Sequence, residues 1–275
     1  MSQLMADKIQ KDTSLGTYLS LTWEMVKMNV LSAMEYRVSF AMQVIGMIIN
    51  DIGLVALWFI FFEKFPEIRG WTFRDTAALF AITTAQFSIV MILANGSFRM
   101  ARMIANGEID NFLSLPKNVL WQISLSKTEV SAFGDLLFGL VIYFFSGNLS
   151  FESFGLFILL SVITAVIFFN FIVITQSIAF FTGNFEEAAV QLFHALLGFT
   201  LYPQTAFFGI LKIITLTILP AFFIAALPVE IFRNFNIFSL SLMIGFAAIT
   251  FFIAIFVFKK GLRRYESGNL INIKI

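Results

Sequence analysis

The sequence predicts an all-α integral membrane protein with six transmembrane helices. Two observations lead to this fold class. Apolar residues make up 59% of the 275 residues and charged residues only 13%, about half the charged share of a soluble domain. The apolar residues also gather in runs long enough to cross a hydrocarbon layer about 30 Å thick. The formal net charge of +1 gives no reason to expect a nucleic acid as a partner.

The first expected element is an amphipathic helix from Leu15 to Arg37. Its apolar side chains recur every three or four residues, while Glu24 and Lys27 lie on other faces. Charge interrupts this stretch too often for a span, so we expect the helix to lie at the membrane surface. The alternative is a cytosolic extension of the first span.

Six apolar segments follow, each read as a span. They run Ser39–Phe62, Thr76–Phe98, Ser131–Ser146, Ser153–Thr182, Ala188–Phe208 and Phe238–Phe258. We therefore expect one transmembrane domain covering residues 1–275. It comprises a cytoplasmic and interfacial segment (1–37), a membrane domain (38–258) and a cytoplasmic tail (259–275).

The segment between the last two spans is apolar but broken by proline. Pro220 and Pro228 interrupt the run from Ile213 to Val229. Proline removes a backbone donor and clashes with the preceding turn. We therefore expect two short re-entrant helices, which persist at membrane depth only where protein or a water-filled cavity covers them. A seventh span is the alternative.

The distribution of Lys and Arg predicts the orientation. With six spans and both termini on one side, that side holds 13 of the 18 Lys and Arg residues and the other side holds 5. Because positive charge is retained in the cytoplasm, we expect both termini there. A seventh span would move the basic cluster at 259–264 outside and weaken the bias.

The connection between the second and third spans carries the most informative soluble-facing segment. We expect a short amphipathic helix in it, with acids in the first turn, where they complement the helix dipole, and a proline at its far end. Its candidate residues are Gly107, Glu108, Ile109, Asp110, Phe112, Leu113 and Pro116. The alternative is an ordinary interfacial connector.

Polar residues within the spans are the other candidates, for a translocation pathway. Asp51, beside Asn50, lies near the middle of the first span, where a carboxylate is costly and marks a functional site by default. The alternative for Asp51 is a structural hydrogen bond to a neighbouring helix. Asn170 and Gln176 are expected mainly to join helices, and His194 to be either titratable or a packing residue.

The side-chain inventory argues against an enzyme. There is no Cys, and His194 is the only His, so thiolate chemistry and His-rich metal sites are excluded. No Gly is followed by Lys, so there is no P-loop, and HExxH and GxSxG are also absent. We therefore expect neither metal nor cofactor on this chain.

Several motifs resemble those of ABC-2 type exporter permeases. The pattern Gly-Glu-Ile-Asp-x-x-Leu-x-x-Pro at 107–116 is similar to the family's cytoplasmic motif after the second span. Tyr202-Pro203, followed by Pro220 and Pro228, resembles the family's broken region before the last span. The resemblance covers essentially the whole chain.

The resemblance implies a permease subunit of an ATP-driven exporter in a bacterial cytoplasmic membrane. A separate ATP-binding subunit would bind ATP and Mg²⁺ and act on residues 107–116, and also on the inner turn that carries Glu186 and Glu187. The alternative for these two glutamates is a solvated turn.

The ending at 261–268 is similar to a subgroup whose permeases occur in pairs beside one ATPase. A second permease subunit is therefore expected, with a heterodimer favoured and a homodimer possible. An ion-coupled secondary transporter or channel using Asp51 is the alternative function. It would need no ATPase, but the sequence lacks the inverted repeat that many such transporters show.

Overall fold

The computed structural model describes residues 15–147, 149–202 and 207–265, and most of these residues are helical. Four helices are long and apolar enough to cross a membrane. The first is α3 (Arg37–Lys64), and the last is α14 (Ile237–Leu262). The second, Phe73–Ala105, is built from α4 (Phe73–Ala94), η1 (Asn95–Arg99) and α5 (Met100–Ala105). The third, Phe151–Thr182, is built from α9 (Phe151–Ser177) and α10 (Ala179–Thr182). The predicted all-helical membrane fold is confirmed, and these four helices match the first, second, fourth and last predicted spans.

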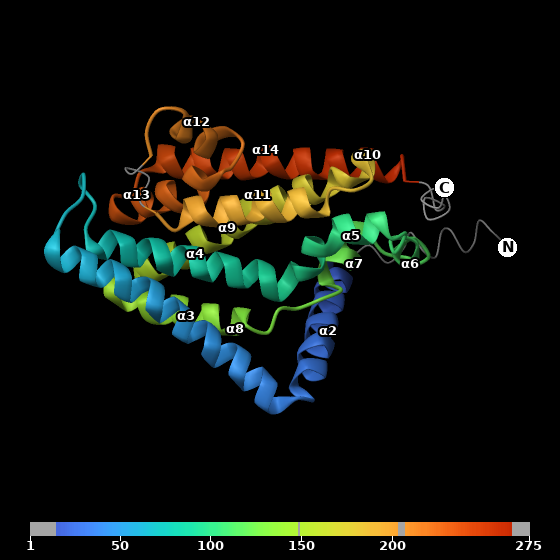
Figure 1. Ribbon diagram of the computed structural model, residues 1–275, viewed down its shortest axis with the longest axis horizontal. Helices are drawn as coiled ribbons and strands as arrows, with labels where there is room; N and C mark the ends of the chain where they lie inside the picture. The colour runs from blue at the N-terminus through green and yellow to red at the C-terminus, as the bar shows by residue number, and fades with distance from the viewer. Residues whose placement is uncertain (1–14, 148, 203–206, 266–275) are drawn as a thin grey trace.

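Shorter elements connect the long helices. In chain order they are α2 (Leu15–Met34), α6 (Asp110–Leu113), α7 (Val119–Leu125), α8 (Ala132–Tyr143), η2 (Phe144–Ser146), α11 (Glu186–Thr200), α12 (Ile210–Thr217), the π-helical turn η4 (Phe222–Ala226) and α13 (Leu227–Arg233). In Figure 1, α4, α9, α11 and α14 run along the long axis of the molecule. We call the two ends of this axis the α6 end and the α13 end.

The third and fifth predicted spans are shorter than a membrane crossing. The third, α8 with η2, ends at Gly147, whose φ of +83° suits glycine. The fifth, α11, has 15 residues, about 22 Å of helix, and stops well before Phe208. Tyr202 precedes Pro203, and a residue before proline disfavours the helical conformation. Pro203 itself lies outside the described residues. By length, the described chain has four spans, or five with the bent helix below.

The broken segment before α14 is present, with one difference from the prediction. α12 and the helix Phe222–Arg233 meet at a 73° bend, and Pro220 lies in the break between them. Pro228 does not break the chain, contrary to expectation. It occupies the first turn of α13, where a missing backbone N–H is tolerated. The π-helical turn η4 comes directly before it.

The main hydrophobic cluster fills the space between α4, α8, α9, η4 and α13. Its largest fully buried side chains include Phe80, Phe157 and Phe168. Close packing of α8 on α4 depends on Gly139, because a Cβ there would lie 2.6 Å from Thr84 Oγ1. This cluster makes α4 and α9 the rigid centre of the molecule.

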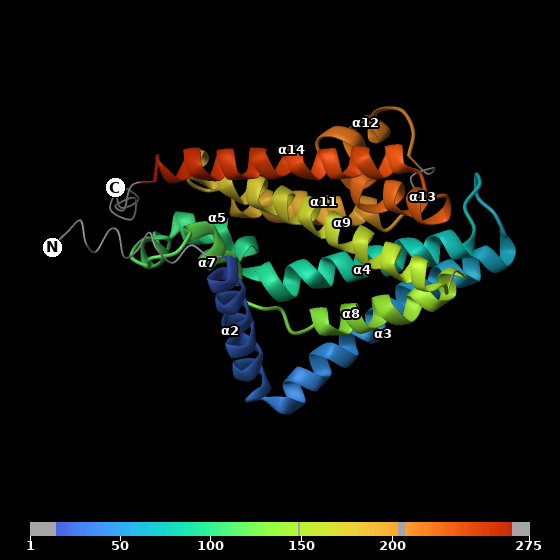
Figure 2. The same ribbon diagram turned by 180° about the vertical axis from the view of Figure 1, so that it is seen from behind.

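α2 and α3 form a V whose vertex lies away from the bundle (Figure 2). The predicted amphipathic helix is α2, which ends at Met34 and not at Arg37. It packs against α7, where Asn29 Nδ2 donates to the backbone oxygen of Leu125 at 3.1 Å. α3 is the least buried of the long helices: 11% of its most apolar window is buried, against 67% for Phe73–Ala105. Most of α3 is therefore open to lipid or to another subunit.

Candidate functional site

Residues 107–116, on which an ATP-binding subunit is expected to act and which we call the coupling segment, lie at the α6 end, and their helix is short. Gly107, with φ +74°, turns the chain after α5, and α6 contains only four residues. Ile109 is fully buried in a second hydrophobic cluster with Met100 and Ile123. Ile109 therefore anchors the segment and does not face outward.

The outer side of this segment is partly apolar. Leu113 is 45% exposed and Leu115 is 49% exposed, while Phe112 is half-buried against the second cluster. Glu108 and Pro116 are also exposed. The segment thus has a fixed base and an apolar tip, next to one exposed acid.

An ion pair joins α5 to the other predicted coupling turn. Arg102 contacts Glu186 Oε1 through Nη2 at 2.5 Å and through Nε at 2.7 Å. Glu187 is exposed. The ion pair therefore links α5, the helix that leads into residues 107–116, to the turn that carries Glu186 and Glu187.

The start of the tail also contacts the coupling segment. Burial and the nearby charge of Asp110 raise the pKa of the Tyr265 hydroxyl to about 12. The Tyr265 ring packs edge-on against Phe180 of α10, with centroids 6.0 Å apart. Gly261 makes this packing possible, because a Cβ there would lie 2.5 Å from Phe180 Cδ2.

Two carboxyl groups face each other inside the helical region. Asp51 of α3 and Asp135 of α8 are 4% and 2% exposed, and their side chains lie within hydrogen-bond reach of each other. The Oδ2 atom of each has no donor. Two carboxylates removed from water and in contact cannot both keep a charge cheaply, so at most one of the two is expected to be ionised.

Asp135 was missed by the sequence reasoning, although the signal was present. It is an acid inside the third apolar segment, as Asp51 is inside the first. Gly134 brings the helices together there, because a Cβ on Gly134 would lie 2.5 Å from the backbone oxygen of Val44. Asn50 is exposed and reaches Asp51 Oδ1 only at 3.5 Å.

The other intramembrane candidates lie apart from this pair. Asn170 Nδ2 donates to Ala247 O at 3.2 Å and to Thr250 Oγ1 at 3.0 Å, which joins α9 to α14. Gln176 Oε1 accepts from the backbone N–H of Ala101 at 2.9 Å. His194 is exposed on α11. Asn170 and Gln176 thus connect helices, as expected.

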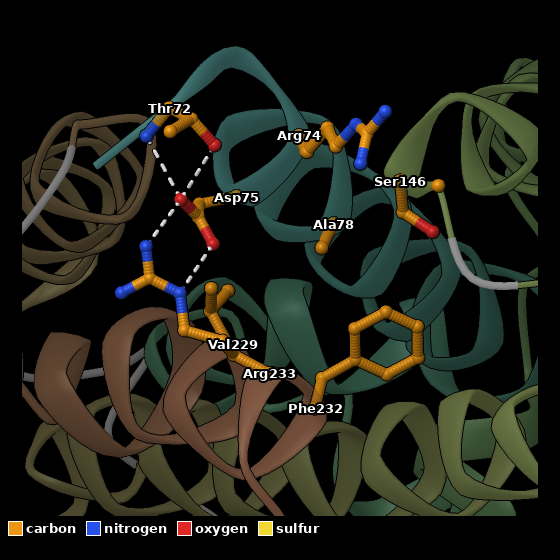
Figure 3. A pocket seen from close by; sticks show the side chains of 9 residues that line it. Thr72, Arg74, Asp75, Ala78, Ser146, Val229, Phe232 and Arg233 are labelled. Atoms are coloured by element: carbon orange, nitrogen blue, oxygen red, sulfur yellow. Dashed lines mark hydrogen bonds and ion pairs between the residues drawn. The ribbon is translucent and has the colours of Figure 1, made fainter. Parts of the chain in front are cut away.

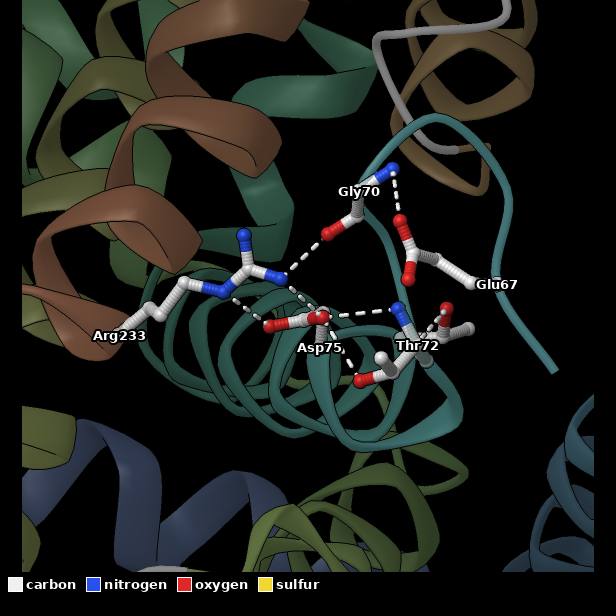
Figure 4. A network of polar contacts seen from close by, with 6 residues as sticks. Glu67, Gly70, Thr72, Asp75 and Arg233 are labelled. Carbon is white, nitrogen blue, oxygen red and sulfur yellow. Dashed lines mark hydrogen bonds and ion pairs between the residues drawn. The ribbon is translucent and has the colours of Figure 1, made fainter.

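A polar network closes the α13 end (Figure 4). Asp75 Oδ1 accepts from Arg233 Nε at 2.9 Å, and Oδ2 accepts from Arg233 Nη2 at 2.6 Å. Oδ2 also accepts from the backbone N–H and the hydroxyl of Thr72, both at 2.8 Å, which caps α4. Arg233 further donates to the backbone oxygen of Gly70. The network ties the 65–72 loop and α4 to α13.

Beside this network lies a hollow of about 340 Å³, shown in Figure 3. Arg74 and Ser146 stand on one side of it, and Asp75 and Arg233 on the other. Arg74 is exposed. From the predicted broken region, Tyr202 packs on Trp58 of α3, with ring centroids 5.9 Å apart.

Comparison with known proteins identifies a transporter family. A family model described as ABC-2 family transporter protein matches residues 48–268. No curated protein and no solved structure matches the chain significantly. The matched region contains the coupling segment, the Asp51–Asp135 pair and the broken helix, whereas α2 lies outside it.

Proposed function

Because the chain belongs to the ABC-2 family of transporter proteins, we propose that it is the transmembrane permease subunit of an ATP-driven exporter. ATP and Mg²⁺ bind to a separate ATP-binding subunit, and this chain converts the motion of that subunit into outward movement of a substrate. The absence of a P-loop from the sequence supports this division of labour.

The coupling segment is the observation that carries the proposal. Leu113 and Leu115 offer an exposed apolar tip to a partner, while Ile109 holds the base of the segment in the second cluster. Because the base of the segment is anchored, a displacement of its tip is passed on to the helix it is attached to. α5 continues α4 through η1, so a push on the segment passes into a helix that is mostly buried. Force therefore reaches the centre of the bundle.

The Arg102–Glu186 pair supports a second route for the same motion. It connects α5 to the first turn of α11. Contact with the ATPase at either segment then displaces both. Glu187 and Glu108, which are exposed, supply negative charge for basic groups of the partner.

The proposed topology has six spans with both termini in the bacterial cytoplasm. The balance of Lys and Arg supports it, and it places the α6 end inside. α8 with η2 and α11 are then spans of about 22 Å, so the membrane must be thinned, or polar residues must enter it, at their ends. The bent pair of α12 and α13 forms a re-entrant element on the outer side.

A second permease subunit completes the proposed pathway. α3 and α14 are the least buried of the long helices, at 11% and 17% of their most apolar windows, and they leave surface for such a partner. The resemblance of the ending at 261–268 favours a heterodimer over a homodimer.

Co-purification tests the proposal. The tagged chain is isolated from its native membrane in mild detergent, and co-purifying proteins are identified by mass spectrometry. The expected partner contains a P-loop and gives the complex ATPase activity. Leu113→Arg should remove it, because a charge replaces the apolar tip. Leu149→Arg is the matched control, since Leu149 is 61% exposed at the opposite end.

The two variants make the result decisive. Loss of the ATPase from Leu113→Arg alone, with both variants equally monodisperse, supports the coupling role. Equal retention by Leu113→Arg refutes that role for this segment. If no P-loop protein co-purifies under several detergents, the subunit assignment itself fails.

Ion-coupled transport is the second candidate, and the Asp51–Asp135 pair is the observation that favours it. Liposomes containing the purified chain alone distinguish the two. Uptake that follows a proton gradient without ATP, and that Asp51→Asn abolishes, would establish the ion-coupled function.

A further inference from the structure

The hollow of about 340 Å³ at the α13 end lies beside the polar network that closes this end (Figure 3). Three parts of the fold line it: the start of α4, the end of η2 with Gly147, and α13. Part of the lining is apolar, since Ala78, Val229 and Phe232 are buried core residues. The volume is at the lower end of the usual range for small-molecule sites.

The acid in this lining is already neutralised. Among the described residues that line the hollow, the charged ones are Arg74, Asp75 and Arg233. Both oxygens of Asp75 accept hydrogen bonds from Arg233, at 2.9 Å and 2.6 Å, and Oδ2 also accepts two from Thr72. Because Asp75 and Arg233 balance each other, the remaining positive charge of the lining is that of Arg74.

Arg74 has no acidic partner in the described parts of the chain. No carboxylate there lies within 4.0 Å of its guanidinium, and no oxygen there accepts a hydrogen bond from it. A guanidinium carries five N–H donors, so all five remain available to a ligand. In Figure 3 this side chain lies next to Ser146, across the hollow from Arg233.

Gly147 leaves room for the Arg74 side chain. A Cβ on Gly147 would lie 3.0 Å from Arg74 Cδ and 3.1 Å from Arg74 Nε, which is closer than side chains normally pack. Gly147 also has a φ of +83°, which favours glycine over other residues. The turn after η2 therefore lets Arg74 lie along the wall of the hollow.

We propose that this hollow binds a phosphate group, held by the Arg74 guanidinium. The planar fork of a guanidinium matches two phosphate oxygens, so a single arginine forms two parallel hydrogen bonds to the group. In the proposed topology the α13 end lies at the outer membrane surface, where lipid headgroups present phosphate. A lipid and a soluble phosphate carry the same chemistry. The site needs no ATPase partner, so it stands or fails separately from the exporter function.

Binding to the purified chain in an uncharged detergent tests the proposal in two arms. Inorganic phosphate is titrated by calorimetry, and bound phosphatidylglycerol is counted by native mass spectrometry against diacylglycerol with the same acyl chains. We expect one phosphate-bearing ligand per chain. Binding of inorganic phosphate identifies a soluble source, and binding of phosphatidylglycerol alone identifies a lipid. Absence of such binding in both arms, or equal retention of diacylglycerol where the lipid alone binds, refutes the proposal.

Three variants assign the binding to the hollow. Arg74→Gln should weaken it by at least about tenfold, because charge-assisted hydrogen bonds to phosphate are lost. Arg74→Lys should weaken it less, because the charge stays and the planar fork is lost. The control Lys64→Gln removes the same charge from an exposed residue at the end of α3, outside the hollow, and should bind as wild type does. Equal binding by Arg74→Gln and Lys64→Gln overturns the proposal.

Discussion

Removing the Asp75 carboxylate should weaken the contact between α4 and α13. This carboxylate accepts hydrogen bonds from Thr72 and from Arg233, and the Asp75 side chain is 9% exposed. Asp75→Ala therefore deletes both the cap of α4 and the link to α13. The Arg233 side chain, 45% exposed, keeps its hydrogen bond to the Gly70 backbone oxygen and its access to water, so it is not left buried without a partner.

The structure sets the size of the effect. Loss of a helix cap costs about 1 kcal/mol, and loss of an ion pair with one exposed partner costs up to about 1 kcal/mol. The free energy of unfolding should thus fall by about 2 kcal/mol, or about 4–8 °C in melting temperature for a chain of this size. Arg74→Ala changes an exposed neighbour in the same turn and should stay within about 0.5 kcal/mol of wild type.

Thermal unfolding in detergent, followed by tryptophan fluorescence, measures this effect. Trp71 is 6% exposed next to the network, and it contributes to the fluorescence together with Trp23, Trp58 and Trp121. A double-mutant cycle with Arg233→Ala should give a coupling energy of about 1 kcal/mol. Additive losses, or an Asp75→Ala melting temperature equal to that of Arg74→Ala, would refute the reasoning.

Three further substitutions test other contacts. The unfolding free energy of Asp135→Asn should stay within about 1 kcal/mol of wild type, because the asparagine amide can donate a hydrogen bond to the Asp51 carboxyl. Asp135→Leu should lower the free energy of unfolding by about 1–3 kcal/mol, because it leaves the Asp51 carboxyl without a donor. Equal melting temperatures for Asp135→Asn and Asp135→Leu would contradict the pairing. Gly261→Ala should lower the free energy of unfolding by about 1–3 kcal/mol, because the added Cβ clashes with Phe180 of α10. Gly245→Ala, where a Cβ would have nothing within 4 Å, should not lower it. Similar thermal unfolding curves for the two variants would refute the close packing at Gly261. Tyr265, with a pKa of about 12 against an ordinary 10, contributes stability that is present below pH 10 and lost as the pH rises to 12. Tyr265→Phe should lack this alkaline loss in a pH series of melting temperatures, and an unchanged profile would count against it.

Length and apolarity alone predicted α3, α4, α9 and α14, because a span needs a long apolar run with few charged residues. The break at Pro220 was also predictable, since proline excludes the backbone hydrogen bond there. Pro228 has the same chemistry but occupies a helical first turn. Where a helix begins relative to a proline depends on packing, which the local sequence does not contain.

The missed contacts are those made across long stretches of chain. Arg102 and Glu186 are 84 residues apart, and Asp75 and Arg233 are 158 apart. No local pattern connects such residues, and without an alignment only the folded bundle does so. Asp135 is different, because an acid inside an apolar run can be recognised in the sequence, although its partner cannot.

The π-helical turn η4 has a consequence for the register of α13. A π turn holds one more residue per hydrogen-bonded ring than an α turn. If η4 relaxed to an α-helix, every later residue of α13 would rotate by about 100° and move by about 1.5 Å along the axis. Arg233 would then turn away from Asp75. The position of Arg233 opposite Asp75, and with it the closure of the α13 end, therefore depends on the one extra residue that the π-helical turn accommodates.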